Sequence, residues 1–509
     1  MRVRDFMSTN VVSVDEKTSI DNARKIMEAH KIRRLPVMKK RKNDVSPVTD
    51  KKVSRRDALK LGIIGAVAGS IAVLKYPSVA AEKKIDESAR KMTVVEHDDF
   101  PNKISKDYKP FNQLNLIFTQ GFMRTNPDIA KIAGKYMQGL NQPGYPDMGV
   151  GYRQLDHAIR KGSESLMTYT THYAAAGIPG HGIQSWEQKK KPKNMFDPIV
   201  VAPKKYKFKT REEASAAIKR AASLYGADLI GITRNDPRWN YTPITDFTRA
   251  MEGKNPVINW SDFPFEPKTV IVLGFGMDYE GMATAPALTE EATTMECYSR
   301  MSKTAFQLSV FLKNLGYQSV PCNNDTALSV PYAVAAGLGE LSRISILINY
   351  KYGPRVRLAK VFTDFDFVEY DKPKTFGVHE FCKRCKRCAD ACPADAIPFD
   401  DEPTWEPTHE HAHLKTGNPG VYKWYLDGYK CFKFWSENHG DCGCCIAACP
   451  YNKPDFWQHR LFDRINAALP GPFHTVMKEL DRIFGYGNTA DKKAVHRFWS
   501  AKGRSYDGF

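Results

Sequence analysis

The sequence lacks any apolar run that approaches the roughly 20 residues of a membrane-spanning helix. This absence argues against an integral membrane protein for the mature chain. The sequence also lacks a G-x-G-x-x-G motif, the phosphate-binding loop of many dinucleotide-binding domains. Cysteine is scarce, with 11 in 509 residues, which is too few for a disulfide scaffold. What remains is typical of a globular protein with about two to four domains.

The net charge of +18 does not indicate a nucleic-acid-binding protein. About half of this charge lies within residues 1–60, and the rest is spread thinly over residues 81–509. Short basic runs such as the three lysines at 189–191 are typical of solvated loops. We therefore expect no nucleic-acid partner.

Residues 1–53 begin with a strand–helix–strand pattern. Valines at 11, 12 and 14 favour a strand, an apolar helical face follows Ser19, and "RRLPVM" favours a second strand. The pattern resembles the first half of a cystathionine-β-synthase-type (CBS) regulatory repeat. The resemblance ends at Lys39, and half a repeat cannot bury its own apolar face. A nucleotide sensor and a remnant or mis-started extension are both open, and the second is favoured.

Residues 54–80 have the three parts of a secretory signal. Paired arginines at 55 and 56 precede an uncharged apolar run over 61–74, and small residues stand at Ser78 and Ala80. The arginine pair resembles a twin-arginine (Tat) signal, although Ala58 replaces the usual Phe. We expect export of the folded protein and a mature chain that begins near Ala81.

An α/β core is expected over residues 206–370, after a loop-rich region over 81–205. Thr210 and Glu213 form a capping box, and Gly226 ends the predicted helix. A second, longer helix is predicted over 293–315. Apolar strands are predicted at "ADLIGIT" (227–233), "TVIVLGFGM" (269–277) and "RISILINY" (343–350).

The cysteines that are present cluster, since nine of the 11 lie between Cys382 and Cys449. They form two runs that each end in Cys-Pro: Cys382, Cys385, Cys388 and Cys392, and then Cys431, Cys442, Cys445 and Cys449. The first run has the spacing of bacterial ferredoxins, in which the fourth cysteine binds the other cluster. A ferredoxin-like domain with two 4Fe–4S clusters is therefore predicted over 371–460, followed by a C-terminal segment over 461–509.

The crossed pattern of ferredoxins assigns the ligands. One cluster takes Cys382, Cys385, Cys388 and Cys449, and the other takes Cys392, Cys431, Cys442 and Cys445. Cys444 is an alternative to Cys442 or Cys445 as a ligand from the second run. A zinc ribbon is the competing interpretation, but zinc sites more commonly use separated cysteine pairs.

Two further groups have simple interpretations. Cys297 and Cys322 stand apart from the runs and are expected to be core thiols. His409, His411 and His413 alternate as on a strand, which suits a metal site, but the Glu and Pro around them favour a loop.

Several stretches together resemble the catalytic subunit of respiratory reductive dehalogenases. They are "ECYSRM" (296–301), "VPCNND" (320–325), "AVAAGLGELSR" (333–343), "RVRLAKVFTD" (355–364), "HEFCKRCKRCADACP" (379–393) and "KWYLDGYKCFKFW" (423–435). The resemblance implies a nitroreductase-like α/β core that binds cobalamin, followed by the two-cluster domain. It implies removal of halogen from a small organohalide as the terminal step of anaerobic respiration.

The cobalamin is implied by this resemblance alone. The D-x-H-x-x-G signature of base-off cobalamin binding is absent, because Asp156-His157 and the histidines at 411 and 413 fail its spacing. The family binds base-off cobalamin without that motif. No corrinoid ligand is assigned here.

The resemblance also places catalytic roles on Tyr298, Asn324 and Arg357. A carbon that loses halide must gain a proton from a positioned acid. A phenol is a reluctant donor, and a guanidinium nearby stabilises the phenolate that donation leaves. Asn324 would hold one of the other two in place. Without the resemblance, these residues are interpreted as a core tyrosine, a turn asparagine and a strand-edge arginine.

Trp424 and Tyr425 have two interpretations at even weight. They form the wall of an apolar substrate pocket, or they pack around the second cluster.

The family further implies a small integral membrane anchor subunit, a quinone-linked electron donor and a position on the outer face of the cytoplasmic membrane. The alternative functions are an epoxyqueuosine reductase-like enzyme and a non-catalytic iron–sulfur electron-transfer subunit.

Overall fold

The computed structural model describes residues 14–15, 37–38, 94–141, 148–172, 200–246, 249–250, 253–454 and 486–500. The chain divides into two compact units, Met1–Lys83 and Lys84–Phe509. Within the described residues, no helix is both long and apolar enough to cross a membrane. The predicted signal at 54–80 and the predicted mature start at Ala81 lie outside the described residues.

The first unit contains two short strands, β1 (Val14–Asp15) and β2 (Val37–Met38). They pair in parallel, with Val14 opposite Val37. Both strands fall where the valine pattern and "RRLPVM" predict them. The helix expected between them lies outside the described residues.

A four-stranded antiparallel sheet forms the centre of the second unit. Its order is β4–β7–β11–β8. The strands are β4 (Leu229–Arg234), β7 (Thr269–Gly276), β8 (Ser319–Cys322) and β11 (Val356–Thr363). Short two-stranded pairs flank it: β3 (Val95–Glu96) with β12 (Lys374–Thr375), β5 (Ile244–Thr245) with β6 (Val257–Ile258), and β9 (Glu340–Leu341) with β10 (Leu347–Ile348).

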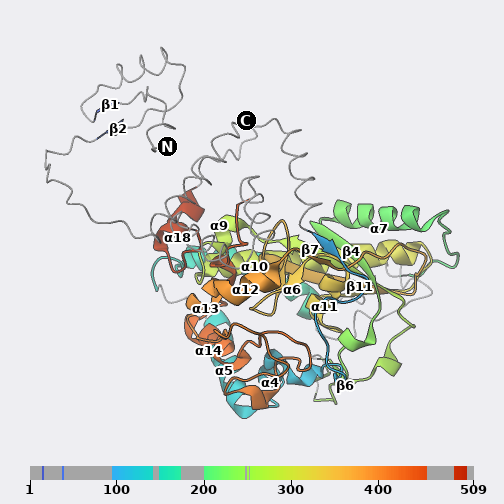
Figure 1. The fold of residues 1–509 in the computed structure, drawn as a ribbon, viewed down its shortest axis with the longest axis horizontal. Helices are drawn as coiled ribbons and strands as arrows, with labels where there is room; N and C mark the ends of the chain where they lie inside the picture. Colours follow the sequence, from blue (N-terminus) through green and yellow to red (C-terminus); the bar gives the residue numbers. More distant parts are fainter. Residues whose placement is uncertain are drawn as a thin grey trace, which may run out of the picture. The chain divides into compact units, whose positions relative to one another are not determined.

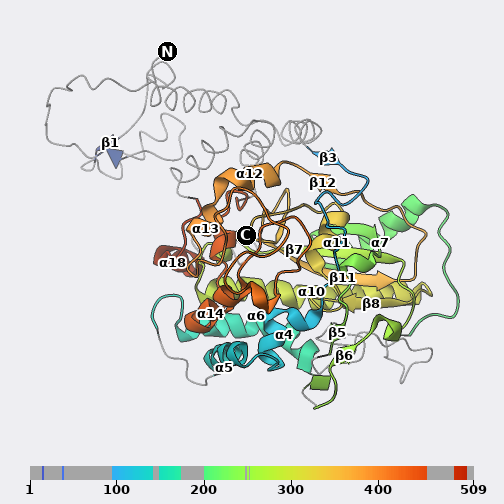
Figure 2. The same cartoon turned by 60° about the horizontal axis from the view of Figure 1, so that its bottom comes forward.

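The central sheet is covered on both faces, and β7 shows this in its sequence. Ile271, Leu273 and Phe275 pack into one hydrophobic cluster, whereas Val270 and Val272 pack into another. Successive side chains of a strand point to opposite faces, so an unbroken apolar strand needs cover on both. Figure 2 shows α10 and α7 beside this sheet.

The longest of the described helices, α10 (Leu288–Asn314), contacts β7, β8, β11, α6 and α7. The described helices that precede it are α4 (Ile117–Phe122), α5 (Pro127–Asn141), α6 (Gln154–His172), α7 (Arg211–Tyr225) and α9 (Tyr279–Met282). After it comes α11 (Ser329–Ala335). Single 3-10 turns occur at Gln113–Asn115, Pro237–Trp239, Trp260–Asp262 and Ala412–Leu414. Figure 1 shows α10 running through the middle of this unit.

The cysteine-rich segment is built from short helices and turns. Its helices are α12 (Val378–Cys385), α13 (Arg387–Asp390), α14 (Gly428–Asn438) and α15 (Cys444–Ala447). The last described helix is α18 (Lys492–Ser500). The chain therefore has the predicted class, a helix-and-sheet core followed by a cysteine-rich segment.

The helix predicted from the capping box is confirmed. The Thr210 hydroxyl accepts a hydrogen bond from the Glu213 backbone N–H, as an N-cap should. Gly226 ends the helix at φ 112°, a left-handed conformation that glycine adopts without a steric cost. The strands at "ADLIGIT" and "TVIVLGFGM" are β4 and β7.

The third predicted strand, 343–350, is wrong. Only Leu347 and Ile348 form a strand, and they pair with β9 outside the central sheet. Ser345 adopts φ 57°, and the Arg343 side chain turns away to donate to the carbonyls of Cys382, Pro398 and Asp400. A tight turn therefore occupies the middle of an apolar run.

The loop-rich prediction for 81–205 is also wrong for its described part, which contains α4, α5 and α6. The face of α6 that packs on α10 buries Asp156, His157 and Arg160. Because these buried side chains are polar, the helix shows little of the apolar periodicity on which sequence analysis relies.

Candidate active site

Tyr298 lies on α10, on the helix face that packs against the central sheet. Its ring is partly buried against the same hydrophobic cluster as Phe275. Its hydroxyl oxygen accepts a hydrogen bond from the Asn324 side-chain amide at 2.9 Å. The helix therefore holds the ring while the hydroxyl stays in reach of a loop at the sheet edge.

Arg357 projects from β11 toward α10. In that strand, Ala359 and Val361 pack into the cluster beneath α10, and residue 357 shares their face. The Arg357 guanidinium lies 5.3 Å from the centre of the Tyr298 ring. Burial disfavours its charge, but neighbouring groups led by Tyr298 hold the pKa of Arg357 above its ordinary value. A permanent cation thus faces the phenol.

Asn324 lies in the loop that follows β8, and this loop is firmly anchored. The buried ammonium of Lys360 donates to the Asn323 carbonyl at 2.6 Å and to the Ser329 hydroxyl at 2.7 Å. The Asn323 amide also donates to Ser302 on α10 at 2.8 Å. These contacts fix the loop, so Asn324 is presented to Tyr298 with little freedom.

The structure therefore brings Tyr298, Asn324 and Arg357 together, although they come from a helix, a loop and a strand. The interpretation of Arg357 as a surface charge at a strand edge is wrong. Its strand lies between β7 and β8, and its side chain is half-buried.

A chain of polar contacts behind Arg357 is not apparent in the sequence analysis. Arg357 donates to the Thr294 hydroxyl at 3.2 Å, and Thr294 donates to a Glu290 carboxylate oxygen at 3.1 Å. Burial raises the pKa of Glu290 to about 7. The signal was present, because Glu290, Thr294 and Tyr298 follow one another at four-residue intervals on a helix, which places them on one face.

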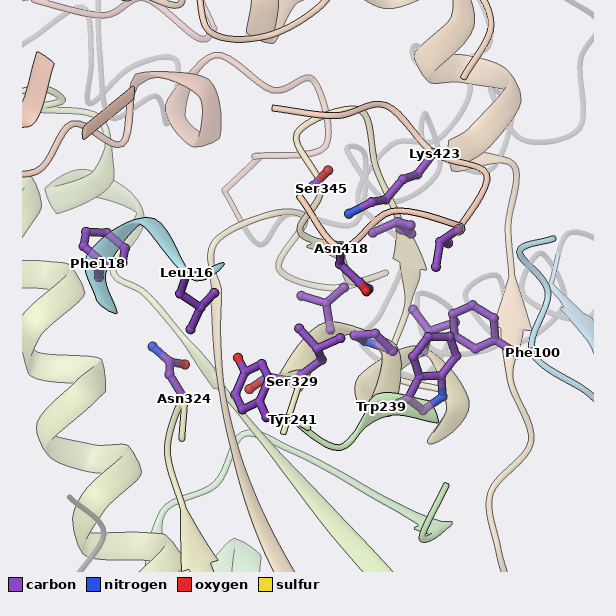
Figure 3. Close-up of a pocket in the computed structure, with 16 residues that line it drawn as sticks. Phe100, Leu116, Phe118, Trp239, Tyr241, Asn324, Ser329, Ser345, Asn418 and Lys423 are labelled. Carbon is purple, nitrogen blue, oxygen red and sulfur yellow. The ribbon is translucent and has the colours of Figure 1, made fainter. Parts of the chain in front are cut away.

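A cavity of about 310 Å³ opens beside Asn324. Its walls are largely apolar and include Phe118, Trp239 and Tyr241. Figure 3 shows these side chains surrounding the cavity with Asn324 at its edge. Aromatic and aliphatic walls with few polar groups suit a small apolar molecule or part of a larger organic cofactor.

The polar groups of this cavity come from distant parts of the chain. Ser345 and Asn418 line it together with Lys423, whose amine is visible in Figure 3. Burial lowers the pKa of Lys423 to about 8. The segment between the two cysteine runs thus supplies part of the wall.

Trp424 and Tyr425 do not line this cavity. Both are buried, with 3% and 4% of their surface exposed. The Trp424 indole donates to the Asp400 carbonyl at 3.0 Å, and the Tyr425 hydroxyl donates to backbone carbonyls at 2.7 Å. Their hydrogen bonds go to the backbone between the two cysteine runs, so they do not form the wall of this cavity, and packing around the second cluster stays a prediction.

The eight predicted cluster cysteines sort into two neighbourhoods. The pKa of Cys388 is raised by burial, then by Cys382, Cys385 and Cys449, and least by Cys445 of the other group. The pKa of Cys445 is raised by burial and then by Cys442, Cys431 and Cys392. Cysteines that are remote in sequence, such as Cys449 and Cys392, thus join the groups that the crossed pattern requires.

The remaining cysteines lie apart from these groups or at their margin. Cys297 and Cys322 are buried free thiols, as expected for core residues. Cys444 is buried at the start of α15 and raises the pKa of Cys442 through a hydrogen bond. It therefore remains a neighbour of the second group.

Comparisons with known proteins add to this geometry. Residues 381–453 match the family model described as a 4Fe–4S dicluster domain. Residues 3–46 match the model of the CBS domain. The chain thus contains a 4Fe–4S dicluster domain, and its N-terminal resemblance extends a few residues beyond Lys39.

Full-length relatives are also found. A tetrachloroethene reductive dehalogenase of Desulfitobacterium hafniense is 31% identical, over 85% of this chain and 94% of its own. That of Sulfurospirillum multivorans is 30% identical, over 89% of this chain and 94% of its own.

Among solved structures, a catabolic reductive dehalogenase in complex with 3-bromo-4-hydroxybenzoic acid has the same fold, with a TM-score of 0.60 at 21% identity. The match covers 80% of this chain and 50% of the length of that protein. On the strength of the full-length relatives, the chain belongs to the reductive dehalogenases, oxidoreductases that act on carbon–halogen bonds.

Proposed function

We propose that this protein replaces the halogen of a small organohalide with hydrogen, with Tyr298 as the proton donor. The balanced reaction consumes two electrons and one proton, breaks the carbon–halogen bond, forms a carbon–hydrogen bond and releases halide. The observation that carries the proposal is the Tyr298 hydroxyl, hydrogen-bonded to Asn324 and facing the Arg357 guanidinium. In this arrangement Asn324 fixes the oxygen, and Arg357 stabilises the phenolate that remains after donation.

The cysteine groups support two 4Fe–4S clusters with crossed ligands. Four buried or half-buried thiols per group, without disulfides among the described cysteines, form a donor set that suits a cubane. We assign Cys382, Cys385, Cys388 and Cys449 to one cluster and Cys392, Cys431, Cys442 and Cys445 to the other.

A cobalamin is the second cofactor that we propose. The hydroxyls, amide and amine of Ser329, Ser345, Asn418 and Lys423 at the apolar cavity suit the amide-rich edge of a corrin ring. When bound, cobalamin would supply electrons to the carbon–halogen bond after receiving them from the two clusters. The chain's own contribution is to shape the cavity and to hold the proton at the Tyr298 oxygen.

The substrate class follows from the cavity and the relatives. The relatives named above act on tetrachloroethene, and aromatic walls suit such a small apolar molecule. The test is product analysis with the reconstituted protein against chlorinated ethenes, ethanes and phenols, with an epoxyqueuosine-containing tRNA as the competing substrate. We expect halide release from at least one chlorinated ethene. Turnover of the tRNA alone, or of none of them at full cofactor loading, contradicts the proposal.

We further propose Tat-dependent export to the outer face of the cytoplasmic membrane. The signal-like residues 54–80 support it, and the function implies a small integral membrane anchor subunit and a quinone-linked electron donor. N-terminal sequencing of active protein from the membrane fraction tests export. A start near Ala81 is expected, and retention of residues 1–60 contradicts it.

A further inference from the structure

A second cluster of metal-binding side chains lies apart from the cysteine groups, at the start of α14. Asp427 is the N-cap of this helix and is only 2% exposed. One of its carboxylate oxygens, Oδ2, lies 2.8 Å from His411 Nδ1. The His411 ring stacks on Tyr429, with 4.2 Å between the ring centres. Packing therefore holds the imidazole in the orientation that faces the carboxylate.

Two further side chains converge on the same place. Glu410, His411 and Asp427 each offer one ligand atom, and these atoms all lie within 4.8 Å of one another. His409 approaches from the more buried side, with its Nδ1 3.6 Å from Asp427 Oδ2. One imidazole and two carboxylates thus share one small volume, and a second imidazole, that of His409, lies beside Asp427.

His409 is the observation that ordinary ion pairing leaves unexplained. Both of its ring nitrogens are buried, and within the described part of the chain neither makes a hydrogen bond. Buried imidazole nitrogens without partners are costly, and native structures usually satisfy them.

Surface ion pairing accounts for part of the cluster. Lys430 lies 2.9 Å from Glu410, which is largely exposed, and so can neutralise that carboxylate. This pair does not reach the His409 nitrogens, and exposed ion pairs contribute little to stability. A cation bound at this cluster would give one of the two His409 nitrogens a partner, which the Lys430–Glu410 pair does not.

We propose that His409, His411, Asp427 and Glu410 bind one divalent cation of the zinc type. Imidazole and carboxylate ligands in a set of four match the usual coordination of zinc. The site contains no thiolate, so it differs chemically from the cysteine groups. It does not depend on the proposed reaction.

The position of the site suggests its use. The chain leaves the cluster at His411, makes the turn Ala412–Leu414 and returns to the cluster at Asp427. Between these ends it contributes Asn418, Val421 and Lys423 to the cavity. A cation that joins the ends closes this loop and fixes one wall of the cavity.

The test uses the cluster- and cobalamin-loaded protein, equilibrated with Zn²⁺ and desalted. Zinc is measured per chain alongside iron, and its ligands are identified by X-ray absorption. His411→Ala and His409→Ala remove ligands. Asp427→Asn guards against misfolding, because asparagine is also a good N-cap but a much poorer zinc ligand. His413→Ala is the matched control, since His413 is exposed: its Nδ1 lies 3.3 Å from the Glu410 carbonyl oxygen, and the centre of its ring lies 6.3 Å from that of His411.

We expect about one zinc per chain in the wild type and in His413→Ala, with nitrogen and oxygen ligands at about 2.0–2.1 Å. Each of the three ligand variants should lose at least about nine-tenths of it, with iron content unchanged. Sulfur scattering at about 2.3 Å would place the zinc in the cysteine groups and overturn the proposal. Equal zinc content in the wild type and His411→Ala would overturn it too.

Discussion

The phenol of Tyr298 has two neighbours with different effects. Asn324 donates a hydrogen bond to its oxygen at 2.9 Å, whereas Arg357 faces the ring at 5.3 Å. In the proposed mechanism, the first contact fixes where the proton is held, and the second stabilises the anion left behind. Tyr298→Phe removes only the hydroxyl and should lower the dehalogenation rate by about 10²-fold or more, in line with general-acid contributions.

The measurement for Tyr298→Phe is halide release at matched cofactor content. Iron and cobalt per chain serve as the control, because the ring still fills its place in the core. A variant with full cofactors and wild-type turnover would show that another group or water delivers the proton. Tyr298 would then be a core aromatic of α10.

Arg357 allows a graded test of charge against geometry. Arg357→Lys keeps a cation but loses the planar guanidinium that donates to Thr294 at 3.2 Å, whereas Arg357→Ala loses both. The lysine variant should therefore retain more activity than the alanine variant in steady-state assays. Equal losses would mean that charge near the phenol is unimportant.

At the scale of elements, Lys360 connects β11 to the loop that carries Asn324. Lys360→Met keeps an apolar stem but leaves the Asn323 carbonyl and the Ser329 hydroxyl without their donor. Each buried group without a partner costs about 1–3 kcal/mol. We expect a lower denaturation midpoint and lower activity. Unchanged values for both would show that the loop is held by its other contacts, such as Asn323 to Ser302.

The fourth cysteine of each run lies with the cysteines of the other run. A substitution at that position should therefore damage the other run's cluster, which the order of the cysteines in the sequence does not suggest. Cys392 is the last cysteine of the first run but has Cys431 and Cys445 as neighbours. Cys392→Ala should therefore damage the cluster of the second run. Electron paramagnetic resonance of the reduced protein checks this, and loss of the signal from the Cys382, Cys385 and Cys388 cluster would refute the crossed assignment.

The elements that sequence analysis identified are those with a regular pattern. The cap of α7 and the apolar run of β7 were recognised from local chemistry alone. Sequence analysis gives no bounds for the strand β11, because Arg357 and Lys360 interrupt its apolar pattern, although both side chains have partners from elsewhere in the fold. Local sequence does not reveal such distant partners.

The same reasoning applies to the candidate site. The cysteine ligand groups could be proposed from spacing, because cluster chemistry restricts spacing tightly. Tyr298, Asn324 and Arg357 could be proposed only through a family resemblance, since each alone has an ordinary structural interpretation. The cavity could not be predicted, because its walls come from Phe118, Trp239 and residues beyond 400, which only the fold brings together.

At the scale of the whole molecule, the helix-and-sheet core and the dicluster domain form parts of one compact unit, Lys84–Phe509. Residues of the core and of the segment between the cysteine runs share the cavity. This arrangement suits an enzyme that delivers electrons from its own clusters to a bound substrate. A protein that only carried electrons would not need the preceding helix-and-sheet core.

Reductive replacement of halogen by hydrogen requires two electrons and one proton for each halide released. Counting all three in one assay tests the proposed reaction directly. The fully loaded protein is given a titrated reductant and tetrachloroethene in D₂O, and halide and product are quantified together. We expect one chloride released for every two electrons consumed, and one deuterium in each trichloroethene formed. Electron consumption without chloride release, or a product without deuterium, would contradict it.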